Sequence, residues 1–194
     1  MDKEQKKQIL EYENHLISWN KTHNLVSKSQ ASNLKEHIDD SLIISPLLED
    51  QIMDLGSGGG LPGIPLAICN PKKQFYLVES SEKKSSFLLN TISKLKLNNA
   101  QVINKRIEDI EDSGLPESFD LIARAVGSTE TILKMCENLL KRHRIKIKLM
   151  KTLQQFQEEN LPAGYTVIKI DKFKLKAKDK TRILVTIEPD RNNG

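Results

Sequence analysis

The sequence contains little cysteine, few aromatic residues and no long apolar run. Two of its 194 residues are cysteines, and neither has a second cysteine at CxxC spacing. Cys69 and Cys136 lie in apolar segments with helical patterning, so we expect buried free thiols and neither a disulfide nor a cysteine metal site. The four histidines also lack metal-ligand spacing, and we predict no bound metal.

No stretch approaches the roughly 20 apolar residues that a membrane-spanning helix requires. The N-terminal segment MDKEQKKQIL also lacks the apolar centre of a signal peptide. We therefore expect a cytosolic protein that does not bind membranes. A chain of 22.1 kDa fits one domain with a short appendage, and we expect a monomer.

Positive charge is concentrated in residues 141–182. This segment holds 13 of the 30 lysines and arginines but 4 of the 26 acidic residues, a net charge of +9. The rest of the chain has 17 basic and 22 acidic residues, a net charge of −5. Such asymmetry favours a polyanionic partner. The alternative is a solvated lysine-rich face that binds nothing in particular.

Apolar periodicity predicts an α/β protein. Helical spacing at residues 3–20 and 30–48 indicates a small helical cap over residues 1–48. From residue 49 to 190, short apolar runs alternate with amphipathic helices, which is typical of a parallel sheet covered by helices. The last two runs lack a helix between them and should form an antiparallel hairpin. The predicted strands are 51–55, 75–79, 101–104, 119–123, 145–150, 165–170 and 182–188, and the predicted helices between them are 61–69, 82–95, 129–140 and 152–160.

The segment IMDLGSGGGLPGIP, residues 52–65, has four glycines in five positions after the first predicted strand. A glycine-rich first strand-to-helix turn lets the backbone approach a ligand closely. A phosphate-binding P-loop is excluded, because Leu61-Pro62 stands where that loop has Lys-Ser/Thr. A dinucleotide site is disfavoured, because Leu61 replaces the third glycine and Asp54 would place a negative charge beside a pyrophosphate.

A cationic ligand reverses this electrostatic argument. S-adenosylmethionine carries an ammonium and a sulfonium and no phosphate, so Asp54 would favour it. Glu79 ends the second strand, where a carboxylate can accept hydrogen bonds from ribose hydroxyls. After the third strand, Ile107 can pack on an adenine face and Glu108 can contact its edge. Each carboxylate also has a structural alternative: Asp54 as a helix cap, Glu79 at a helix dipole, Glu108 as a solvated turn residue.

Several motifs closely resemble the bacterial RsmG family, also called GidB. They are WNKTHNLVS (19–27), EHIDDSL (36–42), DLGSGGGLPGIPLAI (54–68), VESSEKKSSFL (78–88) and IARAV (122–126). The resemblance implies a seven-stranded, Rossmann-like class I methyltransferase. It also implies an activity, the transfer of a methyl group from S-adenosylmethionine to N7 of a guanine in the decoding-site loop of 16S rRNA. The implied partner is 16S rRNA or the small ribosomal subunit.

Position by position, the resemblance implies residue roles. The implied cofactor contacts are Gly56, Leu61, Ile107, Glu108 and Arg124, with Glu79 as the expected ribose partner. The close approach that the glycine-rich loop allows adds Gly58 to the predicted cofactor site. The implied RNA contacts are Arg124, Lys151 and Arg182. His37 and Asp40 match an H-x-x-D-S stretch of the cap whose role is either structural or substrate-side. Around the fifth strand, the family's Pro-Gly-Gly turn and Lys-Gly ending are replaced by residues 140–144 and 150–152.

The chemistry of guanine N7 requires no general base, because its lone pair is exposed at neutral pH. We therefore predict that Arg124 positions the target and that no histidine or carboxylate removes a proton. Alternating lysines would contact RNA phosphates from one side of an extended strand; they are Lys172, Lys174, Lys176 and Lys178. Two other functions stay open: a methyltransferase for another substrate, and a non-catalytic RNA-binding assembly factor.

Overall fold

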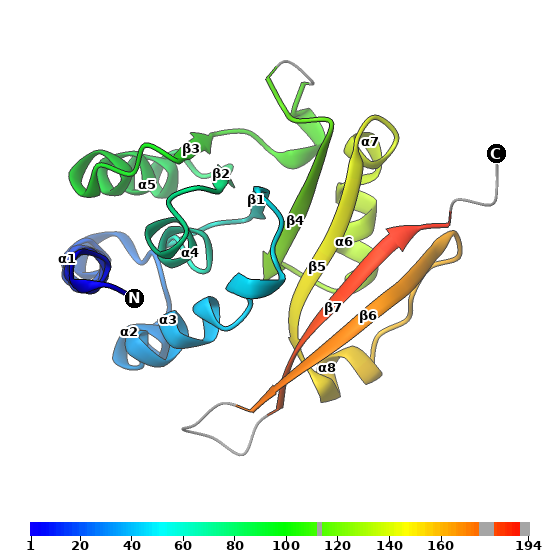
Figure 1. Ribbon diagram of the computed structural model, residues 1–194, viewed down its shortest axis with the longest axis horizontal. Helices are drawn as coiled ribbons and strands as arrows, with labels where there is room; N and C mark the ends of the chain where they lie inside the picture. Colours follow the sequence, from blue (N-terminus) through cyan, green and yellow to red (C-terminus); the bar gives the residue numbers. More distant parts are fainter. Residues whose placement is uncertain (112–113, 175–180, 191–194) are drawn as a thin grey trace.

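A seven-stranded sheet runs through the centre of the computed structural model, which describes residues 1–111, 114–174 and 181–190 (Figure 1). The strand order is β3-β2-β1-β4-β5-β7-β6. The first five strands are parallel, and β7 lies antiparallel to both β5 and β6. The predicted mostly parallel sheet with a C-terminal hairpin is therefore confirmed. The strands are β1 Gln51–Leu55, β2 Gln74–Val78, β3 Ala100–Ile103, β4 Ser118–Arg124, β5 Arg144–Thr152, β6 Tyr165–Lys174 and β7 Thr181–Pro189.

Helices cover both faces of the sheet (Figure 1). Two predicted helices are divided. The segment 30–48 breaks at Asn33, whose side-chain amide donates to the Ser29 carbonyl, and again before Pro46. The segment 129–140 breaks at Cys136. The helices are α1 Lys3–His23, α2 Lys28–Ser32, α3 Leu34–Leu42, η1 Ser45–Leu47, α4 Gly63–Cys69, α5 Glu82–Leu95, η2 Ile107–Asp109, α6 Thr129–Met135, α7 Glu137–Leu140 and α8 Leu153–Gln157.

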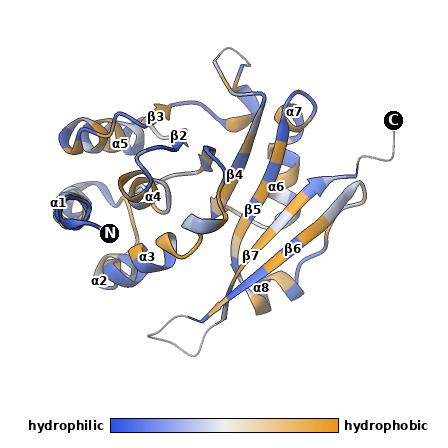
Figure 2. Ribbon diagram, viewed as in Figure 1, coloured by the Kyte–Doolittle hydropathy of each residue, from blue (hydrophilic) through white to orange (hydrophobic). Residues whose placement is uncertain are grey.

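Alternating side chains of the strands build two hydrophobic cores, one on each face of the sheet. On β1, Ile52 belongs to the core formed with α1, α3, α4 and α5, whereas Met53 belongs to the core formed with η2, α6 and α7. On β2, Phe75 and Tyr76 divide in the same way. This two-residue period is the expected geometry of a strand covered on both faces. Hydrophobic and hydrophilic residues also alternate along β6, at the sheet edge (Figure 2).

The N-terminal helices pack directly on the loop after β1. Tyr12 and Leu16 on α1 are fully buried and share a core with Ile64 on α4. The Tyr12 hydroxyl donates a hydrogen bond of 2.7 Å to the Gly59 carbonyl oxygen. The helical cap therefore forms one wall beside the glycine-rich loop.

Backbone and side-chain hydrogen bonds hold the turn into β5, where the resemblance leads us to expect glycines. The backbone N–H of His143 donates to Leu139 O at 2.8 Å. The Arg142 guanidinium donates to Ile110 O at 3.2 Å, and the His143 ring lies 2.9 Å from Pro116 O. At the other end of β5, Thr152 caps α8 through a capping box with Gln155. These contacts let β5 keep its place without the missing glycines.

Candidate methyl-donor and RNA site

Glu79 connects the loops that follow β1 and β2. Its carboxylate accepts hydrogen bonds from the backbone N–H of Gly58 at 2.9 Å and from that of Ser81 at 2.8 Å. The backbone N–H groups of Gly56 and Ser57 donate to the Val78 carbonyl. Glu79 is 7% exposed. The two loops are thus fixed against each other at the carboxyl ends of parallel strands, where ligands of this fold class bind.

Glycine serves two different purposes in the loop. Gly58 has φ +56°, and a Cβ there would meet nothing nearer than the Gly56 carbonyl oxygen at 3.7 Å. By contrast, a Cβ on Gly59 would lie 2.8 Å from Val26 Cγ1, and one on Gly63 would lie 2.4 Å from Leu77 Cδ2. Gly58 therefore faces open space that a ligand can fill, whereas Gly59 and Gly63 permit close packing.

Asp54 lies beneath the loop and does not reach its open side. It is 1% exposed, and its Oδ2 atom accepts the Gly63 N–H at 3.1 Å, at the start of α4. Burial raises the pKa of Asp54 to about 7, although hydrogen bonds from Ser57 and Gly63 and the charge of Arg124 oppose the rise. Asp54 is therefore a buried carboxylate that is not exposed on the open side of the loop, and its attraction for a cationic ligand stays a prediction. The structure shows the alternative, a helix-capping carboxylate.

The remaining predicted cofactor residues differ in accessibility. Ile107, at the start of η2, is 2% exposed and packs in the second core, so little of its side chain is open to an adenine ring. Glu108, the next residue, is exposed. Leu61 packs against the first core. Gly56, Gly58 and Glu79 lie together. η2, which carries Ile107 and Glu108, follows β3 at the same carboxyl-terminal end of the parallel strands.

Arg124, at the end of β4, is bound to the helical cap. Its guanidinium lies 3.3 Å from the Asp40 carboxylate and donates to His37 O at 3.0 Å and to Ser41 Oγ at 3.1 Å. Burial lowers the pKa of Arg124, and Asp40 opposes this effect. Among the described residues, the ion pair of Arg124 is thus with Asp40 on α3.

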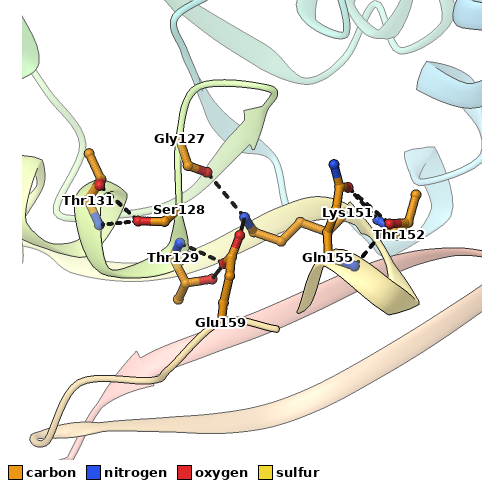
Figure 3. Close-up of polar contacts among 8 residues, drawn as sticks. All are labelled: Gly127, Ser128, Thr129, Thr131, Lys151, Thr152, Gln155 and Glu159. Carbon is orange, nitrogen blue, oxygen red and sulfur yellow. Dashed lines mark hydrogen bonds and ion pairs between the residues drawn. The ribbon is translucent and has the colours of Figure 1, made fainter. Parts of the chain in front are cut away.

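Lys151, near the end of β5, is held by Glu159 (Figure 3). Its ammonium lies 2.7 Å from Glu159 Oε1 and 3.2 Å from the Gly127 carbonyl oxygen. The other oxygen of Glu159 accepts from the N–H and the hydroxyl of Thr129, at the first turn of α6. Burial acts to raise the pKa of Glu159, but the hydrogen bonds from Lys151 and Thr129 outweigh it and the pKa is lowered.

The three predicted RNA contacts line one cleft of about 490 Å³ at the ends of β4 and β5. Arg124, Lys151 and Arg182 reach it from three different strands, and His37 and Gln30 close it from the cap. We call it the strand-end cleft. Lys172 and Lys174 are exposed on β6, whereas Lys176 and Lys178 lie outside the described residues.

Sequence reasoning missed two acidic partners. Asp40 is 2% exposed and bridges Arg124 and Arg182, whereas the H-x-x-D-S pattern left its role open. Glu159 follows a short helix and has no pattern that connects it to Lys151. Nothing in the spacing of these residues predicts their contacts, because each pair is made by packing between elements.

Neither a membrane-spanning helix nor a metal-binding cluster of side chains occurs among the described residues. No described helix combines the length and the apolar character that crossing a membrane requires. No group of three or more His, Cys, Asp or Glu side chains in the described part of the chain is arranged to hold a metal ion.

The fold and the strand-end loops define the class. The chain has the fold of a SAM-dependent methyltransferase from Aquifex aeolicus, with a TM-score of 0.59, 16% identity and coverage of 87% of this chain and 97% of that one. The family model of rRNA small subunit methyltransferase G (GidB) matches residues 5–185. The chain belongs to this family, and the predicted Rossmann-like fold and rRNA methyltransferase activity are confirmed.

Individual relatives agree with this assignment. The ribosomal RNA small subunit methyltransferase G of Haemophilus influenzae is 37% identical over 170 residues, which are 86% of this chain and 82% of the relative. That of a Shewanella species is 36% identical over 187 residues, 95% of this chain and 89% of the relative. The similarity therefore includes the cap, the glycine-rich loop and the strand-end cleft.

Proposed function

We propose that this protein transfers the methyl group of S-adenosylmethionine to N7 of a guanine in the decoding-site loop of 16S rRNA, as a monomer in the cytoplasm. The observation that carries the proposal is the family match over residues 5–185 together with a built site at the strand ends. Because the substrate is ribosomal RNA, the protein acts where ribosomal subunits are assembled.

The residues at the strand ends fit the methyl donor. Gly58 leaves a cradle that any side chain would fill, and the backbone at Gly56 curves with φ +68° beside it. Glu79 presents a carboxylate for the ribose hydroxyls, and Glu108 is exposed at the place proposed for the adenine edge. When bound, the sulfonium supplies an electrophilic methyl group.

Besides binding the methyl donor, the protein has to position the guanine. N7 already has a free lone pair, so no side chain has to remove a proton. Holding two reactants in line can contribute on the order of 7 to 11 kcal/mol. Arg124, fixed by Asp40 and His37, provides a rigid cationic edge to the strand-end cleft. Lys151 and Arg182 supply further positive charge for the RNA on the same cleft.

The test is methyl transfer from radiolabelled S-adenosylmethionine to small subunits isolated from cells that lack the enzyme. We expect label in 16S rRNA, released as N7-methylguanosine and mapped to one nucleotide of the decoding-site loop. Label on free nucleosides or on protein would assign a different substrate. Calorimetry on the isolated protein should detect binding of S-adenosylmethionine; RNA binding without it would indicate a non-catalytic assembly factor.

A further inference from the structure

A second cleft on the helical cap adjoins the strand-end cleft. Gln30 lines both of them. The second cleft, of about 530 Å³, lies between the segment 20–30, which includes the end of α1 and the start of α2, and Lys84 on α5. We call it the cap cleft. The two clefts thus share Gln30, four positions after Val26, whose side chain lies against the glycine-rich loop.

The cap cleft is positively charged and its charge is not compensated. It is lined by Lys21, Lys28 and Lys84, and no Asp or Glu occurs among its described lining residues. Within the described part of the chain, none of these three lysines forms an ion pair or a side-chain hydrogen bond.

The strand-end cleft differs in this respect. Each of its three basic side chains, Arg124, Lys151 and Arg182, already contacts a carboxylate of the chain itself. A polyanion binds less strongly to cations that are already paired with a carboxylate than to unpaired cations. Binding to an unpaired cation releases only counterions. The stronger attraction for phosphate near the site therefore comes from the cap cleft.

The backbone that carries these lysines is held in place. α1 ends at His23, its C-cap residue Asn24 adopts φ +50°, and the side chain of Asn20 accepts the Val26 N–H at 2.9 Å. Ser27 and Gln30 then form a capping box that starts α2. The asparagines of the WNKTHNL motif, which the methyl-donor site does not use, thus fix the turn between Lys21, in the last turn of α1, and Lys28, the first residue of α2.

The connection between α1 and α2 also contacts the glycine-rich loop. A Cβ on Gly59 would lie 2.8 Å from Val26 Cγ1 and 3.7 Å from the Leu25 carbonyl oxygen, so the two backbones are in close contact. An RNA strand whose target guanine enters the strand-end cleft would pass Gln30 and reach the three lysines. Contacts of lysine to phosphate set the orientation of an RNA and carry no base preference.

We propose that the cap cleft binds the phosphate backbone of the substrate RNA through Lys21, Lys28 and Lys84, next to the methylated guanine. This inference rests on the proposed function, since it takes ribosomal RNA as the substrate. The distribution of charge along the sequence predicts RNA binding by the C-terminal segment. The proposal assigns part of that binding to the N-terminal helices.

The test compares two triple variants of the full chain. One replaces Lys21, Lys28 and Lys84 with Gln. The control replaces Lys3, Lys6 and Lys72, exposed lysines that form no ion pair within the described residues. Lys3 and Lys6 begin α1, a helix of 21 residues and so about 30 Å long, whose other end carries Lys21. Lys72 follows α4, whose last residue accepts a hydrogen bond from Gln5.

We expect the cap-cleft variant to bind deproteinised 16S rRNA and the small subunit at least tenfold more weakly. The slope of log affinity against log salt should fall by about 2, for three lost phosphate contacts. The affinity for S-adenosylmethionine, measured by calorimetry, should stay within twofold of wild type. The control variant should match wild type in all three measurements.

The outcomes separate the two proposals. Equal RNA affinity and salt slope in both triple variants would overturn the cap-cleft proposal while wild-type methylation stands. Weaker binding to the small subunit alone, with unchanged binding to deproteinised RNA, would assign the cleft to a ribosomal protein and would also overturn it. Absence of methyl transfer by the wild-type protein would instead contradict the proposed function.

Discussion

Arg182 on β7 donates a hydrogen bond of 3.1 Å from Nε to the carboxylate of Asp40 on α3, 142 positions earlier in the chain. The other oxygen of the same carboxylate lies 3.3 Å from Arg124 on β4. One buried acid on the cap thereby positions two arginines of the strand-end cleft. Because these arginines come from β4 and β7, the cap, the parallel strands and the hairpin meet at Asp40.

Replacing Asp40 with Asn should destabilise the protein and weaken RNA binding. Removing one partner of a buried ion pair costs about 3 to 5 kcal/mol, and both arginines lose the group that holds them. Urea unfolding measures the stability, and steady-state methylation measures KM for the small subunit. We expect a raised KM with little change in the affinity for S-adenosylmethionine.

The control is the replacement of Asp39, an exposed neighbour on the same helix, with Asn. It should leave both stability and KM near their wild-type values. If Asp40→Asn lowered stability but left KM unchanged in the folded protein, Asp40 would have a structural role without a positioning role.

Asp54 should make the stability depend on pH near neutrality. Its pKa in the folded protein is raised from 3.8 to about 7 by burial, so the folded state holds the proton more tightly than the unfolded state. The free energy of unfolding should then fall as the pH rises from 5 to 8, by roughly 2 to 3 kcal/mol from this group. Urea unfolding of wild type and Asp54→Asn across this range isolates the contribution.

In Asp54→Asn, this part of the pH dependence should vanish. The free energy of unfolding should therefore fall less in the variant than in wild type as the pH rises. Asp50→Asn, which removes an exposed carboxylate beside the same strand, serves as the comparison. A difference that stayed constant from pH 5 to pH 8 would show that Asp54 is ionised throughout the range.

Two neighbouring glycines should respond differently to Ala. At Gly58, the new methyl group enters the open cradle, so we expect at least a tenfold loss in affinity for S-adenosylmethionine. The left-handed backbone there adds about 1 to 2 kcal/mol of strain. At Gly59, the methyl group would lie 2.8 Å from Val26 Cγ1, so the cap must shift and the loss should appear mainly in stability.

Calorimetry gives the cofactor affinity of both glycine variants, and thermal unfolding gives their stability. The contrast between adjacent positions is the control, because each receives the same methyl group. Wild-type cofactor affinity in Gly58→Ala would remove this glycine from the methyl-donor site.

Two lysines of β5 provide a matched pair. Lys148 lies 2.8 Å from Asp120, and Lys151 lies 2.7 Å from Glu159, so each has a carboxylate partner. Lys151 lines the strand-end cleft and Lys148 does not. Both Lys→Met changes should lower stability, because each leaves an unpaired acid.

For methylation by the folded fraction, we expect the two lysine variants to diverge. Lys151→Met should raise KM for the small subunit about tenfold, through the loss of an RNA contact, whereas Lys148→Met should leave KM within twofold. Equal KM values in the two variants would show that Lys151 contributes to the fold and not to RNA binding.

The pattern of strands was readable from the sequence because it depends on local periodicity. Apolar runs such as residues 145–150 predict buried strands, and β5 at Arg144–Thr152 contains that run in full. The absence of a helical pattern between the last two runs predicted the antiparallel hairpin, which the pairing of β6 with β7 confirms. Helix ends were less predictable, because Asn33 and Cys136 interrupt segments whose apolar pattern is continuous.

The environments of the charged residues could not be predicted in this way. The sequence shows the carboxylate of Asp54 but not its burial: packing of α4 encloses that carboxylate, and burial raises its pKa. Likewise, Lys151 has a carboxylate partner eight positions later only because α8 turns the chain back toward α6.

By itself, the sequence determined the succession of strands and most of the helices along the chain, the position of the glycine-rich turn and membership of an rRNA methyltransferase family. These features follow from periodicity and from motifs that are contiguous in the chain. Only the tertiary structure decided which cations near the site are neutralised. Arg124, Arg182 and Lys151 meet carboxylates from distant elements, while Lys21, Lys28 and Lys84 gather without one among the described residues. The physical reason is that an ion pair depends on a distance of a few ångströms in space, which residue spacing along the chain does not specify.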